Sequence, residues 1–114
     1  MKPQVSARAR REMLMILGAS RLQFGVEAER RYRNLVDQAI SDIGADPARA
    51  GVRPYSTSER IFLYHLRHAR ARTPRALRVQ RPRHVIVFRR VGERVEVLFL
   101  MHDEMDLPSR LAEF

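Results

Sequence analysis

The chain has 114 residues, the size of one domain, and contains no cysteine, which excludes disulfide scaffolds, thiolate zinc sites and cysteine nucleophiles. Its 22 basic residues outnumber its 13 acidic residues and give a net charge of +9, and every basic residue except Lys2 is an arginine. No apolar run approaches the roughly 20 residues that a membrane-spanning helix needs, and the first residues do not resemble a signal peptide. We therefore expect a cytoplasmic protein, without metal or cofactor, that binds polyanions or acidic partners.

The N-terminal third predicts a short strand followed by a helical hairpin. Residues 3–5 favour the strand, and Ser6 is a typical N-cap for the first helix. Apolar or small residues then recur at helical spacing, and Gly25 is expected to end the helix. This stripe comprises Ala9, Met13, Ile16, Leu17, Ser20 and Phe24.

The second helix has the clearest periodicity in the chain. Its apolar positions repeat at intervals of three and four residues between Ala28 and Ile43. Gly44 and the pair Asp46-Pro47 are expected to end it. The two helices would share one apolar face as an antiparallel hairpin.

The remaining chain predicts three strands and two long loops. A loop over 45–58 precedes a strand at 61–66, and an exposed, arginine-rich loop over 68–82 follows that strand. Strands at 84–89 and 95–101 are joined by a tight hairpin connection, and residues 108–114 favour a short C-terminal helix. The predicted fold class is α+β, with both helices packed on one face of a mainly antiparallel sheet, in a single domain over 1–114.

The excess positive charge is concentrated in one stretch. Residues 60–92 contain ten arginines and no acidic residue, whereas residues 93–114 carry two basic and six acidic residues. We consider three roles for this stretch: binding of nucleic-acid phosphates, binding of an acidic protein segment, or a solvated basic surface. Its candidate binding residues are Arg67, Arg70, Arg72, Arg75, Arg78, Arg81, Arg83, Arg89 and Arg90.

The order of elements and several short motifs together resemble one family. The last strand and the residues after it, Val95 to Asp106, carry the most specific similarity. The other motifs are Ala9-Arg10-Arg11-Glu12, Phe24-Gly25, Ala28 with Tyr32, Asp46-Pro47, and Pro82-Arg83-His84 leading to Val87-Phe88-Arg89. The chain is similar over nearly its whole length to the RelE/ParE superfamily of toxins from bacterial type II toxin–antitoxin modules, and its C-terminal motif is closer to the ParE branch.

This resemblance implies a function and an alternative. ParE-type members inhibit growth by binding DNA gyrase and need no catalytic residue, and a cognate antitoxin neutralises them. RelE-type members are ribosome-dependent, metal-independent endoribonucleases that cleave mRNA. Related sequences often place an arginine in the final strand where this chain has Phe99, and this difference weakens the RelE interpretation. A third hypothesis is a non-toxic nucleic-acid-binding domain.

The nuclease alternative requires a base, an acid and a clamp for the phosphate. The candidates are His102 or His68 for proton transfer, Arg67 and Arg89 for the clamp, and Tyr64 as a platform for a nucleobase. His84, at a strand start, is expected to be structural. These residues would form a site only if Arg67, Arg89 and His102 converge on one phosphate.

Two further expectations concern the partner and the acidic residues near the C-terminus. For the ParE-like hypothesis, the candidate partner-binding residues are Arg67, Arg70, Arg83, Arg89 and Arg90, and the antitoxin's apolar anchors are expected near Leu14, Leu22 and Leu98. The cluster of His102, Asp103, Glu104 and Asp106 fits no standard metal motif. We expect its acids to pair with neighbouring arginines and His102 to bond the adjacent backbone.

Overall fold

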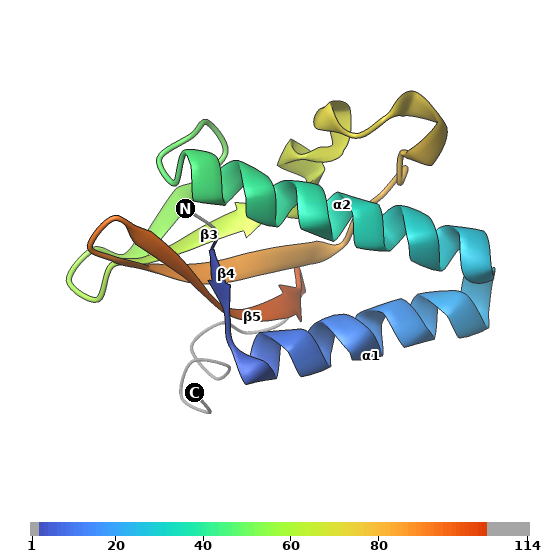
Figure 1. Cartoon of the computed structure of the whole chain (residues 1–114), viewed down its shortest axis with the longest axis horizontal. Coiled ribbons are helices and arrows are strands. Elements are labelled where there is room, and N and C mark those ends of the chain that lie inside the picture. Colours follow the sequence, from blue (N-terminus) through green and yellow to red (C-terminus); the bar gives the residue numbers. More distant parts are fainter. Residues whose placement is uncertain (1–2, 105–114) are drawn as a thin grey trace.

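The computed structural model describes residues 3–104. Two antiparallel helices lie side by side (Figure 1), α1 over Ala7–Phe24 and α2 over Val26–Ala45. Gly25 alone separates them, and its φ of 97° is a conformation that glycine adopts without steric cost. The predicted helical hairpin and its turn at Gly25 are therefore confirmed.

Five strands form one mixed sheet in the order β1-β5-β4-β3-β2. Their bounds are Gln4–Val5, Arg53–Ser56, Ile61–His65, His84–Val91 and Arg94–His102, numbered along the chain. Pairing is antiparallel except between β1 and β5, which run parallel. The predicted α+β class and mainly antiparallel sheet are confirmed, with β4 at the centre of the sheet.

The two faces of the sheet bury different sets of residues. On the face covered by the helices, Ile86, Phe88 and Val97 pack with Leu35 and Ala39 of α2. The second face carries its own apolar cluster, formed by Ile61, Val85, Val87, Leu98, Phe99 and Met101. Because side chains alternate along β4, even-numbered residues face the helices and odd-numbered residues face away from them.

A bulge at Leu98 changes this alternation in β5. Val87 pairs with Phe99 and Phe88 pairs with Val97, so Leu98 is the extra residue. Ser6 stabilises the bulge from the start of α1, because its hydroxyl donates to the Leu98 carbonyl at 2.6 Å and accepts from the Ala9 N–H at 3.0 Å. The predicted N-cap therefore also ties α1 to the sheet.

Three sequence predictions differ from the structure. The predicted loop over 45–58 contains the edge strand β2, where Pro54 weakens the sequence signal for a strand. The loop over 68–82 is not fully exposed, because it folds into short 3₁₀ turns that bury Ala69 and Thr73. Phe24 lies at the end of α1 and is 69% exposed rather than packed. The predicted C-terminal helix lies outside the described residues.

Candidate functional site

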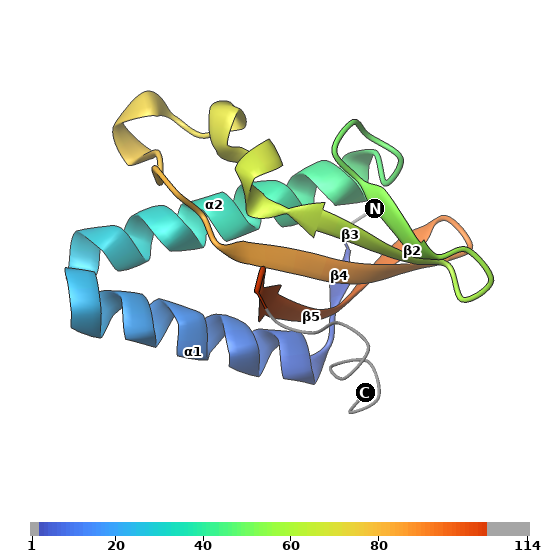
Figure 2. The ribbon, with the colours of Figure 1, turned by 180° about the vertical axis from the view of Figure 1, so that it is seen from behind.

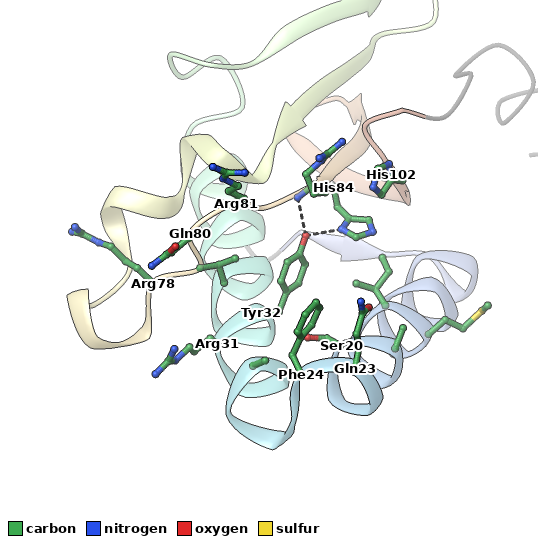
Figure 3. Close-up of a pocket in the computed structure, with 16 residues that line it drawn as sticks. Ser20, Gln23, Phe24, Arg31, Tyr32, Arg78, Gln80, Arg81, His84 and His102 are labelled. Carbon is green, nitrogen blue, oxygen red and sulfur yellow. Dashed lines mark hydrogen bonds between the residues drawn. The ribbon is translucent and has the colours of Figure 1, made fainter.

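A pocket of about 710 Å³ lies between the helical hairpin and the segment that leads into β4 (Figure 3). The inner side of α1 contributes an apolar wall, and the 78–81 segment contributes polar and basic side chains. Tyr32 of α2 lies between these two sides. The pocket is lined by Met15, Ile16, Ala19, Ser20, Gln23, Phe24, Ala28, Arg31, Tyr32, Arg78, Val79, Gln80, Arg81, Arg83, His84 and His102.

The polar centre of the pocket is a hydrogen-bonded pair, Tyr32 and His84. The Tyr32 hydroxyl lies 2.5 Å from His84 Nδ1 and accepts the backbone N–H of Arg83 at 3.2 Å. Burial raises the pKa of Tyr32 to about 12, and burial together with nearby His102 lowers the pKa of His84 to about 4. Both groups are therefore neutral at pH 7, and the Tyr32 O–H donates to Nδ1.

A second polar network joins the ends of three strands beside this pair. His65 at the end of β3 contacts Asp103 at 3.1 Å, and Arg83 bonds both Asp103 and Glu104. Hydrogen bonds from His65 and then from Arg83 lower the pKa of Asp103. The Glu104 backbone N–H donates to His102 Nδ1 at 3.2 Å.

These contacts confirm that the acids near the end of β5 pair with a neighbouring arginine and that His102 bonds local backbone. The Arg83 guanidinium therefore already has two ion-pair partners within the protein, Asp103 and Glu104. Within residues 3–104, no group of three or more His, Asp or Glu side chains is placed to hold a metal ion. Asp106 lies outside the described residues.

The structure does not bring the proposed nuclease residues together. Arg89 pairs with Ile61, which belongs to the cluster on the sheet face away from the helices, whereas His102 pairs with His84 on the helix-covered face. Arg89 also lies five positions from His84 along β4, or roughly 16 Å at about 3.3 Å per residue. Arg67 follows β3 near the His84 end of the sheet, so it too is remote from Arg89.

The other nuclease candidates have structural environments. Tyr64 is fully buried in the core, so it cannot stack on a nucleobase. His68 packs against the ring of Tyr64, and burial is the main cause of its lowered pKa. A Cβ added at Gly51 would lie 2.7 Å from His68 Cγ, so the two residues pack closely.

Several arginines of the basic stretch hold the connection between β3 and β4 in shape. Arg70 donates to the Val79 carbonyl at 2.7 Å, and Arg78 donates to the carbonyls of Thr73 and Ala71. Arg72 bonds the buried carboxylate of Asp42 at 2.9 Å. By contrast, five arginine side chains of this stretch have no hydrogen bond or ion pair with any described residue: Arg67, Arg75, Arg81, Arg89 and Arg90. Arg90 lies over the Phe62 ring.

Only two of the three leucines expected near the antitoxin's anchors are exposed. Leu14 and Leu22 are 63% and 91% exposed on α1, but Leu98 is fully buried and cannot contact a partner. The bulge directs Leu98 into the second apolar cluster, which explains the error. Phe99 is also buried, and the Arg8 guanidinium lies 4.8 Å from its ring centre.

The sequence did not indicate that Tyr32 and His84 form the polar centre of the pocket, or that Asp42 is a buried anchor. Tyr32 and His84 are 52 positions apart, so no local motif connects them. Asp42, which receives bonds from Gln38 and Arg72, could have been found as a lone acid within the apolar spacing of α2.

Comparisons with known proteins do not assign a family or a function to this chain. No protein-family model matches the chain, and no curated protein matches it. Among the helices of residues 3–104, none combines the length and the apolar character that spanning a bilayer requires.

Proposed function

We propose that this protein is the toxin of a type II toxin–antitoxin module, belongs to the RelE/ParE superfamily and acts in the manner of the ParE branch. It would inhibit growth by binding a macromolecular target, DNA gyrase by resemblance, and a cognate antitoxin would neutralise it. The order β-α-α-β-β-β-β and the motifs in its helices and last strand support this assignment. As a binding toxin it needs no catalytic residue.

The observation that carries the choice of branch is the separation of Arg89 from His102. A phosphate clamp and a proton-transfer residue must contact one scissile group to cleave RNA. Here these residues lie on opposite faces of the sheet. The geometry therefore favours a binding toxin over the RelE-like endoribonuclease that remains the alternative.

The exposed side of α1 supports an acidic protein as the antitoxin. Leu14, Met15 and Leu22 are exposed there, and the arginines beside them have no bond to any described residue. The only acid of α1, Glu12, is partly buried and pairs with Arg8. An amphipathic segment with apolar anchors and carboxylates would complement this surface, and it would fold as it binds. The flanking arginines are Arg10, Arg11 and Arg21.

This location changes the expected set of partner-binding arginines. Arg70 and Arg83 are already bonded within the protein, to a loop carbonyl and to two carboxylates respectively. Arg67, Arg89 and Arg90 form no ion pair with any described residue, and they remain candidates for contact with the target.

The test is inducible expression in a bacterium that lacks the antitoxin, with DNA and total RNA examined from the same cells. We expect growth arrest with gyrase-linked DNA breaks and intact mRNA. The control is the variant Leu35→Asp, which places a carboxylate in the core and removes the folded state. Arrest by both chains would identify a nonspecific effect of overproduction and contradict the proposal.

The remaining outcomes also decide between hypotheses. Arrest with cleaved mRNA and unbroken DNA would replace the proposal with the nuclease, and variants at Arg67 and His102 would then locate its site. Normal growth with the protein folded and abundant would refute a toxin activity. Steep salt dependence of binding to plain DNA or RNA, without arrest, would instead indicate the generic nucleic-acid-binding domain.

A further inference from the structure

The pocket beside Tyr32 has the dimensions and lining of a small-molecule site. Its volume of about 710 Å³ lies within the usual range for pockets that enclose ligands of drug size. Ile16, Phe24 and Ala28 give it an apolar wall, whereas the opposite side carries arginines. None of the described residues that line it is acidic, so its charge is positive at neutral pH.

One hydrogen-bond donor in the pocket has no acceptor. Since Tyr32 donates its O–H to His84 Nδ1, the neutral imidazole carries its own proton on Nε2. None of the described residues accepts a hydrogen bond from this Nε2–H. His84 is only partly buried, and its Nε2 is not among the fully enclosed unpaired atoms of the described residues, so this donor is open to an acceptor atom of a ligand in the pocket.

The arginines at the pocket's edge are available to an anion. Arg31 and Arg81 are exposed and form no ion pair with any described residue. Figure 3 shows Arg31, Arg78 and Arg81 on one side of Tyr32, and Ser20 and Gln23 of α1 on the other. A ligand that spans the pocket would therefore meet cations at one end and, at the other, the side of α1 where apolar residues such as Ile16 lie beside Ser20 and Gln23.

We propose that this pocket binds an amphipathic organic anion, with its acidic group at Arg31 and Arg81, its apolar body against α1 and an acceptor atom facing His84 Nε2. The ligand class is a carboxylate or sulfonate carrying an aromatic or aliphatic body. This site adjoins the exposed side of α1 assigned to the antitoxin and shares Met15 with it, but the proposal does not depend on the protein being a toxin.

The test uses two fluorescent probes that differ in one group, with the full-length chain. The probes are 1-anilinonaphthalene-8-sulfonate and its uncharged analogue N-phenyl-1-naphthylamine. We expect the sulfonate to bind at one site per chain, at least tenfold more tightly than the neutral probe, and to be displaced by dodecanoate. Equal affinity for the two probes, or binding at many sites per chain, would overturn the proposal.

Matched variants locate the binding site. The double change R31Q/R81Q should weaken the sulfonate about tenfold and leave the neutral probe unaffected. The control R10Q/R11Q removes the same charge from the exposed side of α1 and should leave both affinities unchanged. Ala19→Trp, at an exposed position that lines the pocket, should weaken both probes by filling the space.

Two results would refute the assignment. If R10Q/R11Q weakened the affinity for the sulfonate as much as R31Q/R81Q, the sulfonate would respond only to net charge or would bind on the exposed side of α1. Unchanged binding in Ala19→Trp would place the probes elsewhere on the molecule. Neither outcome bears on toxicity, so this proposal and the proposed function can fail separately.

Discussion

Helix α1 and the connection from β3 to β4 both carry several arginines, but they use them differently. In the connection, Arg70 and Arg78 donate to backbone carbonyls and Arg72 bonds Asp42 (Figure 2 shows this connection, in yellow, beside α2). On α1, Arg11 and Arg21 have no bond to any described residue.

The difference follows from the backbone of each region. A helix satisfies most of its own carbonyl groups, whereas a chain of short turns leaves carbonyls that need other donors. Arginine supplies such donors in a rigid fork. A dense run of arginines therefore indicates a binding surface only where the backbone does not already use their guanidinium groups.

The largest expected effect concerns the point where the connection joins β4, at His84. Its pKa is about 4 in the folded protein and about 6.5 in the unfolded chain, so the unfolded chain binds more protons between these values. The free energy of unfolding should fall by roughly 3 kcal/mol as the pH drops from about 6.5 to 4.

Urea denaturation of the wild type and His84→Asn at pH 7, 5 and 4 measures this effect. The difference in stability between the two proteins should shrink, and then reverse or vanish, toward pH 4. Two parallel stability curves would show that His84 is not the group that titrates. Tyr32, whose pKa is about 12, stays protonated throughout this range.

The next effect concerns the anchor that holds the connection against α2. Asp42 is 2% exposed and bonds Arg72, Arg49 and Gln38. Asp42→Asn removes the carboxylate charge and leaves these arginines without their counter-ion. The Arg72 side chain is half exposed, so water solvates its guanidinium in the variant and limits the loss of stability. We expect a loss of about 2 kcal/mol, measured by chemical denaturation.

Asp37→Asn is the matched control, because Asp37 is an exposed acid on the same helix and has no ion pair with any described residue. It should change stability by less than about 0.5 kcal/mol. Equal losses in the two variants would mean that charge on α2, rather than the anchor, determines stability.

The smallest effect tests the comparison of arginines directly. Arg70→Met keeps an apolar stem and removes the donor to the Val79 carbonyl, which should cost about 1 kcal/mol. Arg75→Met in the same connection and Arg21→Met on α1 remove guanidinium groups without a described partner and should cost less than about 0.5 kcal/mol. Thermal unfolding at one pH compares all three, and a larger loss for Arg21→Met would contradict our assignment of roles.

Sequence reasoning predicted the regular elements better than it predicted the site. The spacing of apolar residues from Ala28 to Ile43 and the glycine at position 25 define the hairpin locally, so both were found. β2 was missed because its strand character comes from pairing with β3 rather than from its Arg-Pro-Tyr-Ser sequence.

The pocket depends on contacts between distant segments. In the sequence, Tyr32 has the same spacing as the other members of the apolar stripe of α2. Only the fold places its hydroxyl beside His84. The separation of Arg89 from His102 likewise depends on strand register, which the sequence specifies only through the completed sheet.

The bond from the Ser6 hydroxyl to the Leu98 carbonyl spans 92 residues. During translation at about 5–20 residues per second, α1 leaves the ribosome several seconds before β5 exists to receive it. The inner side of the hairpin is therefore open to chaperones or to a waiting partner until most of the chain has been made. Contacts of such long range also slow folding, so the new protein passes through a period in which its apolar core is exposed.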